Sequence, residues 1–463
     1  MKRKLPLLAL SLALAIAGQS MAAATGTKVL SFDRAIKLAQ QGDPWLNGNQ
    51  HKQNSIEALS IAAGTLPDPK VSVGLANLAT DSLQFDQEGM TQLKVGVAQM
   101  FPRGDSLAIK RQQLSLQSQQ FPFLRQDREA KVAVTVGSLW LDAYRVQQSI
   151  ALIEKNRSLF EQLTDVAQAS YSSALGKTRQ QDVVRAQLEL TRLEDRLNQL
   201  NQRKNRFEGQ LSQWLNEYFQ TRQIGADWQG MAGVHNVNFG TSLPQIDLFN
   251  KSLVYSENWL KPDQLVPYFS RHPAVMALDK KIAASKTGIK LAKQKYQPEW
   301  GVNASYAYRD DDPMGNSRSD LFSVGVTFDL PLFTENRQDQ QVKSAVSQAE
   351  AVKTEKLLLL RQLLGAYSSG KGRLIKLNER KALYENQLMP QIHDQAEASL
   401  TAYTNDDGDF AEVVRARIAE LNAEIDQLVI NVEQQKIILE LNYLFVTGRD
   451  ASGHQASFAG DVK

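Results

Sequence analysis

The sequence predicts an α+β membrane protein built from two copies of one unit, in which a β-hairpin precedes two long helices. The first hairpin lies between Pro69 and Pro102, and a long helical pattern follows it. The same arrangement returns 229 residues later, where Pro298 matches Pro69 and Pro331 matches Pro102. Several features that share one offset indicate an internal duplication. Strand-like alternation in both hairpins and coiled-coil spacing in the helices complete the prediction.

The N-terminus predicts a secretory signal peptide over residues 1–22. Three basic residues at positions 2–4 precede an apolar run over residues 5–17, and small residues then mark a cleavage site near Ala22. A membrane anchor is the alternative. The apolar run argues against an anchor, because it is well short of the ~20 residues that a spanning helix needs.

Charge and cysteine content limit the function classes. The chain carries 53 basic and 50 acidic side chains, and loss of the three basic residues of the signal peptide leaves 50 of each. A neutral mature chain argues against a nucleic-acid partner, because such partners bind a net basic face. The chain has no cysteine, which excludes disulfides, thiolate metal sites and a lipid-modified cysteine after the signal. No other apolar stretch reaches the ~18 residues of a transmembrane helix, but an exported chain can also span a membrane with β-strands, whose signal is weaker.

Both hairpins, residues 70–101 and 299–330, alternate between apolar and small or polar side chains. The second hairpin is clearest, and its apolar face consists of Trp300, Val302, Ala304, Tyr306, Tyr308, Phe322, Val324, Val326, Phe328 and Leu330. Alternation over ~9–10 residues, with aromatic side chains towards the ends, is typical of strands that face lipid on one side and a lumen on the other. A soluble sheet with one wet face is the alternative. Glycine and asparagine on the minor face and the long helices that follow argue against it.

The helical stretches carry apolar seams with the three-and-four spacing of coiled coils. The first descending helix has two offset seams, so we expect a neighbouring helix on two of its sides. One seam consists of Val132, Val136, Leu139, Ala143, Val146, Ile150 and Ile153, and the other of Leu152, Leu159, Leu163 and Val166. In the second copy we predict a descending helix from about Gln338 to Leu400. Its returning helix is predicted to end near Thr447 and Gly448, where glycine suits a C-cap.

These patterns divide the chain into five parts. They are the signal peptide (1–22), a first repeat (23–222) with a tip near 172–181, an irregular equatorial segment (223–260), a second repeat (261–447) with a tip near 403–411, and a flexible C-terminal tail (448–463).

Four strands per chain require a partner. Four strands cannot close into a barrel, and an open sheet edge in lipid leaves backbone groups without hydrogen bonds. Two copies would give eight strands with an interior filled by side chains. Three copies would give twelve strands and a lumen, and a lumen continuous with a tube of helices is a conduit.

The duplicated plan, the signal peptide and two strand-ending motifs resemble the TolC family of outer-membrane efflux channels over essentially the whole mature chain. The motifs are Val-Gly-Val…Phe-Pro at 95–102 and Val-Gly-Val…Leu-Pro at 324–331. The resemblance implies a homotrimer in the outer membrane of a Gram-negative bacterium. It would form a twelve-stranded β-barrel, continued by a twelve-helix coiled-coil α-barrel in the periplasm. It also implies two partners, a periplasmic adaptor (membrane fusion) protein and an inner-membrane pump of the RND type. Neither a cofactor nor enzymatic activity is expected.

The two helix tips carry the candidate gate. Val-Val-Arg-Ala follows each tip, with an offset of 230 between the copies. In the resembled family these tips close the tunnel and dock the adaptor. Asp182 and Glu412 match acidic positions of the family, and Tyr403 matches a tyrosine. With Arg185 and Arg415, they form the hypothesised periplasmic gate, held closed by pairs between helices. Arg415 stands where some relatives carry an acidic residue, so the pairing pattern differs here.

Two further sets of tip residues complete the hypothesis. Asp406, Asp407 and Asp409, repeated threefold, would form an acidic pore mouth that favours cations. Leu175 and Gly176 are the candidates for adaptor docking. The alternative is a solvated turn with ordinary charges at the helix ends.

The cargo follows less directly from the sequence. Three stretches, at 66–69, 99–102 and 180–187, look most like the heavy-metal efflux branch of the family. The histidines are scattered without ligand spacing, but a passive duct need not bind its cargo. Drug efflux and type I protein secretion are the alternatives within the family. A periplasmic coiled-coil scaffold with a small soluble β-domain is the alternative from another class.

Overall fold

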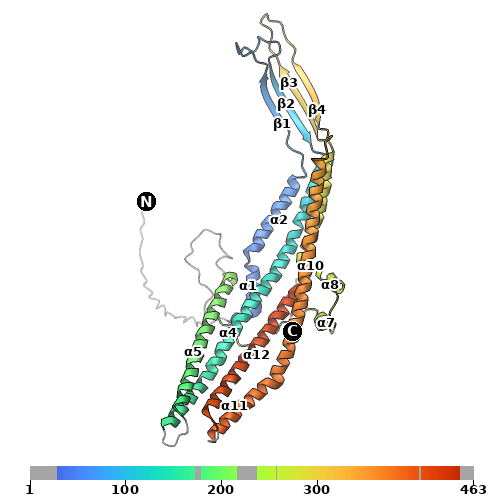
Figure 1. Ribbon diagram of the computed structural model, residues 1–463. Helices are drawn as coiled ribbons and strands as arrows, with labels where there is room; N and C mark the ends of the chain where they lie inside the picture. The colour runs from blue at the N-terminus through green and yellow to red at the C-terminus, as the bar shows by residue number, and fades with distance from the viewer. Residues whose placement is uncertain (1–28, 173–178, 216–236, 257, 406–407, 449–463) are drawn as a thin grey trace, which may run out of the picture.

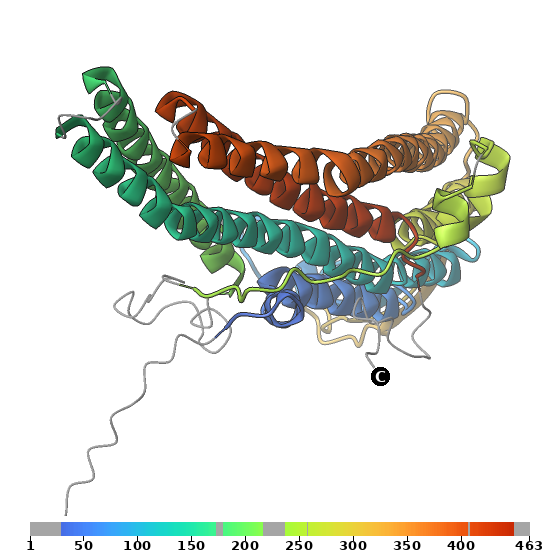
Figure 2. The ribbon, with the colours of Figure 1, turned by 90° about the horizontal axis from the view of Figure 1, so that it is seen from below.

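The computed structural model describes residues 29–172, 179–215, 237–256, 258–405 and 408–448. The molecule is elongated, with four strands at one end and two helical tips at the other (Figure 1). Between these ends the long helices lie beside one another in a curved layer (Figure 2). No described helix combines the length and the apolar character that crossing a membrane requires.

In the first half, helices precede and follow a hairpin: α1 Phe32–Gln41, α2 Pro44–Ala62, β1 Lys70–Ala76, β2 Gln92–Phe101, α3 Ser106–Ser118, α4 Gln120–Ser172 and α5 Gln180–Leu215. The carboxylate of Asp43 begins α2, because it accepts a hydrogen bond from the N–H of Trp45 at 3.0 Å. Pro44 occupies the first helical position, where its missing N–H costs nothing. Pro67 and Pro69 then favour an extended chain leading into β1.

The second half repeats this order: α7 Lys251–Val254, α8 Pro262–Phe269, α9 Pro273–Lys293, η1 Gln294–Tyr296, β3 Trp300–Tyr308, β4 Leu321–Phe328, α10 Gln338–Leu383, η2 Tyr384–Leu388, α11 Met389–Thr404 and α12 Phe410–Leu444. The cap of α9 is the counterpart of the cap of α2. The imidazole of His272 accepts a hydrogen bond from the N–H of Ala274, and Pro273 occupies the first helical position. The duplication is therefore visible in helix caps as well as in strands.

The four strands form one antiparallel sheet in the order β1-β2-β3-β4. Its register places the apolar side chains of all four strands on one face. Val73 lies opposite Val95, and Tyr306 lies between Val95 and Phe322. These side chains are exposed within one chain, and Phe322 reaches 73% exposure. The other face carries glycine, serine, alanine and asparagine, as the alternation predicts.

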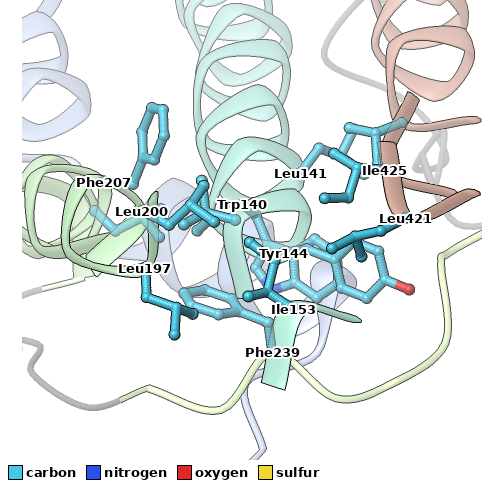
Figure 3. Close-up of a cluster of buried hydrophobic side chains, with 14 of the residues drawn as sticks. Trp140, Leu141, Tyr144, Ile153, Leu197, Leu200, Phe207, Phe239, Leu421 and Ile425 are labelled. Carbon is cyan, nitrogen blue, oxygen red and sulfur yellow. The ribbon is translucent and has the colours of Figure 1, made fainter. Parts of the chain in front are cut away.

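The main core surrounds α4 (Figure 3). Side chains of α5 cover one side of α4 and side chains of α12 cover another, which confirms the prediction that two seams bring two neighbours. The labelled members of this core are Trp140, Leu141, Tyr144 and Ile153 of α4, Leu197, Leu200 and Phe207 of α5, Leu421 and Ile425 of α12, and Phe239. Trp140 also donates a hydrogen bond to the carbonyl of Leu30 at 2.8 Å, which fastens the N-terminal segment to α4.

The predicted descending helix from about Gln338 to Leu400 is present as α10, η2 and α11, but its middle contains a π-helical turn that was not predicted from the sequence. A π-helical turn, η2, separates α10 from α11, and the N–H of Met389 bonds to the carbonyl of Tyr384, five residues earlier. Pro390 is the physical reason, because a proline inside a helix cannot donate a hydrogen bond and its ring clashes with the carbonyl four residues before it. The wider turn relieves that clash.

The expected end of the returning helix is also corrected. The returning helix α12 ends at Leu444 and not near Gly448, whose N–H instead donates to the carbonyl of Arg271 at 2.7 Å. Gly448 therefore connects the segment after α12 to the loop before α9, and it does not cap α12. The segment 223–260 is irregular where it is described, except for the short helix α7, and its first part lies outside the described residues.

Candidate functional site

At the first tip, Asp182 stabilises the start of α5. Its carboxylate accepts a hydrogen bond from the N–H of Arg179 at 2.9 Å, and its own N–H donates to the carbonyl of Arg179 at 2.9 Å. The bond from the Arg179 N–H to the Asp182 carboxylate is one half of a capping box, and the positive end of the helix dipole strengthens it. Asp182 is only 5% exposed. Arg185, one turn further on, is exposed and makes no ion pair with the described residues.

The second tip is closed by Gly408 and Asp409. A side-chain carbon at Gly408 would lie 2.6 Å from the backbone nitrogen of Tyr403, so only glycine fits this turn. The carboxylate of Asp409 accepts a hydrogen bond from the N–H of Ala411 at 3.1 Å and caps α12. The ring of Tyr403 packs edge-on against Phe410, with centroids 5.6 Å apart. Of the three aspartates of the hypothesised pore mouth, Asp409 therefore has a structural role as well.

Glu412 and Arg415 pair with each other on α12. Their side chains approach to 2.5 Å across one helical turn, and the side chains of Glu412 and Arg415 are 44% and 68% exposed. Among the described residues of one chain, the five hypothesised gate residues make no ion pair between helices. The side chains of Arg185, Glu412 and Arg415 are thus accessible to neighbouring molecules.

Apolar side chains next to both tips belong to the main core. Ala186 of α5 and Phe410, Val413 and Val414 of α12 belong to the same buried cluster. The residues Leu175, Gly176, Asp406 and Asp407 lie outside the described residues.

A charged network that no sequence pattern indicated joins α11 to α12. Arg417 of α12 bonds to Glu397 of α11 at 2.6 Å and to Glu420 at 2.8 Å, and His393 of α11 bonds to Glu420 at 2.7 Å. Arg417 is only 10% exposed, so this network lies partly inside the helix pair. No motif marks the network, because its members become neighbours only when the two helices pack.

The network shifts the pKa values of its members. The hydrogen bond and charge of Glu420 raise the pKa of His393 above its ordinary value. Partial burial alone would raise the pKa of Glu420, but hydrogen bonds from His393 and Arg417 outweigh it and lower this pKa. Both shifts favour the ion pair between the two helices.

At the opposite end of the molecule, the sheet has two open edges. β1 pairs only with β2, and β4 pairs only with β3, among the strands that the structure describes. The apolar face between these edges ends in aromatic rings, where Trp300 and Phe328 lie 4.8 Å apart. A sheet with an exposed apolar face and two open edges is incomplete as a single chain.

No protein-family model matches the sequence, and no curated protein is significantly similar to it. Solved structures, however, share the fold. The chain resembles the CmeC outer-membrane channel of Campylobacter jejuni with a TM-score of 0.69 at 10% identity, over 91% of this chain and 87% of that one. It resembles the open state of the MtrE outer-membrane channel of Neisseria gonorrhoeae with a TM-score of 0.67 at 11% identity, over 90% and 89% of the two chains.

A third solved structure supports the same conclusion. The outer-membrane protein VceC of Vibrio cholerae matches with a TM-score of 0.66 at 13% identity, over 90% of this chain and 96% of that one. The chain therefore shares the fold of these solved outer-membrane proteins over about nine tenths of its length.

Proposed function

We propose that this chain is one subunit of a homotrimeric outer-membrane efflux channel of the TolC family. It would act as a passive conduit and not as an enzyme. The observation that carries the proposal is the four-stranded sheet, whose apolar face is exposed and whose two edges are open. In lipid such edges must pair, and pairing each β4 with the β1 of the next copy closes a ring. Three copies would supply twelve strands, enough for an open lumen.

Fractionation and sizing test this proposal. We expect the protein in the outer-membrane fraction, released only by detergent, with three chains per particle by light scattering and with channel activity in planar bilayers. Release in osmotic shock fluid without detergent would contradict the channel and favour a periplasmic coiled-coil scaffold.

The proposed gate is a ring of charged tip residues contributed by the three copies. Arg185 and Arg415 are exposed on one chain, Glu412 is partly exposed, and all three would pair with neighbouring copies, while Asp182 and Tyr403 hold the tips in shape. Asp409, together with Asp406 and Asp407, would give the mouth a negative potential that favours cations. Single-channel recordings of a variant with all three aspartates replaced by asparagine test the ring. Unchanged conductance and cation selectivity would contradict it.

The proposed partners are a periplasmic adaptor at the tips, contacting Leu175 and Gly176, and an inner-membrane pump of the RND type. The proposed cargo is heavy-metal cations, which the acidic mouth would favour. Growth of a deletion strain under copper, silver, cobalt, zinc, antibiotics and bile salts tests the cargo. Sensitivity to metals alone supports metal efflux, whereas sensitivity to antibiotics or bile salts favours drug efflux.

A further inference from the structure

Two large apolar side chains stand exposed where the chain leaves the sheet. Leu332 and Phe333 follow β4, and their exposures are 71% and 90%. A turn at Pro331, in which the N–H of Leu332 donates to the carbonyl of Leu330 at 2.9 Å, keeps both side chains close to the end of the strand. An exposed pair of this size on an ordered turn indicates a missing contact.

A groove lies on the other side of the same sheet, where the chain enters β1 and leaves β2. Its volume is about 420 Å³, and it is lined by Ala62, Ala63, Thr65, Leu66, Pro67, Asp68, Pro102 and Leu107. Most of this lining is apolar or uncharged, and Leu66 is 52% exposed. A single phenyl ring and a leucine side chain are of a size to occupy such a groove.

The pattern of the strands limits how two copies can pair. The apolar face carries odd-numbered residues in β1, such as Val71, and even-numbered residues in β4, such as Val326 and Phe328. Opposite residues of an antiparallel pair share a face, so an odd residue of β1 must lie opposite an even residue of β4. With the strand ends aligned, Val71 of one copy lies opposite Val326 or Phe328 of the next.

Either register brings the exposed pair to the groove. Counted by residue number past the strand ends, the first register brings Phe333 of one copy level with Gly64 of the next, and the second brings it level with Leu66. Leu66 lines the groove, and Gly64 lies between two lining residues, Ala63 and Thr65. The contact joins two different surfaces, as a closed ring of identical copies requires.

We propose that Leu332 and Phe333 of each copy insert into the groove around Leu66 of the next copy and lock the ring below the membrane-spanning strands. The inference rests on the proposed trimer and adds its specific interlock. The occupant is a second copy and not lipid, because pairing of the two open edges places the groove beside the exposed pair. The groove and the pair lie at opposite edges of one chain, so no chain can satisfy itself.

Disulfide cross-linking tests the interlock directly, since the natural chain has no cysteine. At a strand spacing of about 4.8 Å, β1 and β4 of one chain lie about 14 Å apart. This is beyond the roughly 4.4–6.8 Å between Cα atoms that a disulfide bridges. The double variant Leu66→Cys/Phe333→Cys should therefore form covalent dimers and trimers upon oxidation. Each single variant and the mismatched pair Leu66→Cys/Leu357→Cys should not.

Sizing in detergent separates failure of the interlock from failure of the trimer. A trimer of the double variant that gives no cross-link overturns the interlock and leaves the channel proposal intact. If the wild-type chain is itself a monomer in detergent, the channel proposal is overturned.

Two further variants distinguish the neighbouring copy from lipid. Phe333→Ala should lower the temperature at which the trimer dissociates in detergent, whereas Met314→Ala, at an equally exposed position (90%) in the loop between β3 and β4, should not. Phe333→Trp in vesicles with brominated lipid gives the second readout, measured against a Trp300→Phe background, because Trp300 lies on the exposed apolar face. Added fluorescence that is blue-shifted and not quenched supports the protein contact, whereas strong quenching or the red-shifted emission of a tryptophan in water overturns it.

Discussion

The two halves of the chain have the same plan but differ in their descending helices. In the first half, the path is α3 and then α4, which begins after a break at Gln119 and runs unbroken for 53 residues to its tip. In the second half, the corresponding path is α10, a π-helical turn of 5 residues and α11, with Pro390 just after the turn. A π-helical turn inside a long helix is often a functional feature, and Figure 1 shows the bend between α10 and α11.

The helix pairs also differ in what holds them near the tips. Apolar side chains from α4 and α5, such as Leu163 and Leu193, belong to the main core. The α11–α12 pair depends in addition on the network around Arg417 and Glu420. Apolar packing does not respond to pH, whereas a partly exposed charged network does. We infer that the second pair is the one that can loosen, and the following predictions test this difference.

The largest effect is expected in the first pair. Leu197 of α5 is buried in the core against α4 (Figure 3), so Leu197→Ala should destabilise the fold by about 2–5 kcal/mol through lost burial and a residual cavity. Denaturant unfolding followed by circular dichroism in detergent measures this. Gln202→Ala, at an exposed position of the same helix, is the control and should change stability by no more than about 0.5 kcal/mol. Equal effects of the two variants would contradict the assignment of the core.

A smaller effect is expected from breaking the network of the second pair. Glu420→Gln removes the charge that Arg417 and His393 bind, and we expect a cost of about 1.5–3 kcal/mol, the range for hydrogen bonds to charged groups. Hydrogen exchange should increase in α11 and leave α4 unchanged. Faster exchange in both helices would show that the two pairs do not loosen independently.

The pH dependence of the second pair follows from His393. Because its pKa is raised in the folded chain, its contribution is fully present below the unfolded value near 6.5 and is lost as pH rises through the folded value. The lowered pKa of Glu420 acts in the opposite direction, since its contribution is lost only as pH falls below its ordinary value near 4.5. The α11–α12 contact should therefore be tightest at mildly acidic pH and weaken towards pH 8. Thermal unfolding at pH 6 and pH 8 measures this, and His393→Gln should remove the difference.

The smallest effect is expected at the exposed tips. Arg415→Gln breaks a solvent-exposed pair with Glu412 and should cost about 0–1 kcal/mol in the isolated chain. Arg185→Gln, at the equivalent position of the first tip, should cost less, because Arg185 has no ion-pair partner among the described residues. If either variant nevertheless increases channel opening in bilayers, the ion pairs lie between copies. Unaltered opening in both would contradict the proposed gate.

The features that the sequence determined by itself are those that depend on local periodicity. Alternation over residues 70–101 and 299–330 predicted the strands and the face each side chain takes, because one residue of shift would exchange the two faces. Heptad spacing predicted that α4 has two neighbours. Proline and glycine predicted where most elements begin and end. The exceptions are the π-helical turn before Pro390, which was not predicted, and the end of α12, which lies at Leu444 and not near Gly448.

Only the tertiary structure decided which polar side chains meet. His393 and Glu420 are 27 residues apart, and Lys436 bonds to Asp142 across 294 residues. Such contacts depend on how α11, α12 and α4 pack, and no local pattern encodes them. The same reason applies to the open edges of the sheet. The strands follow from alternation. That β1 and β4 lie outermost is a property of the folded chain, and so are the groove beside β1 and the position of Phe333 beside β4.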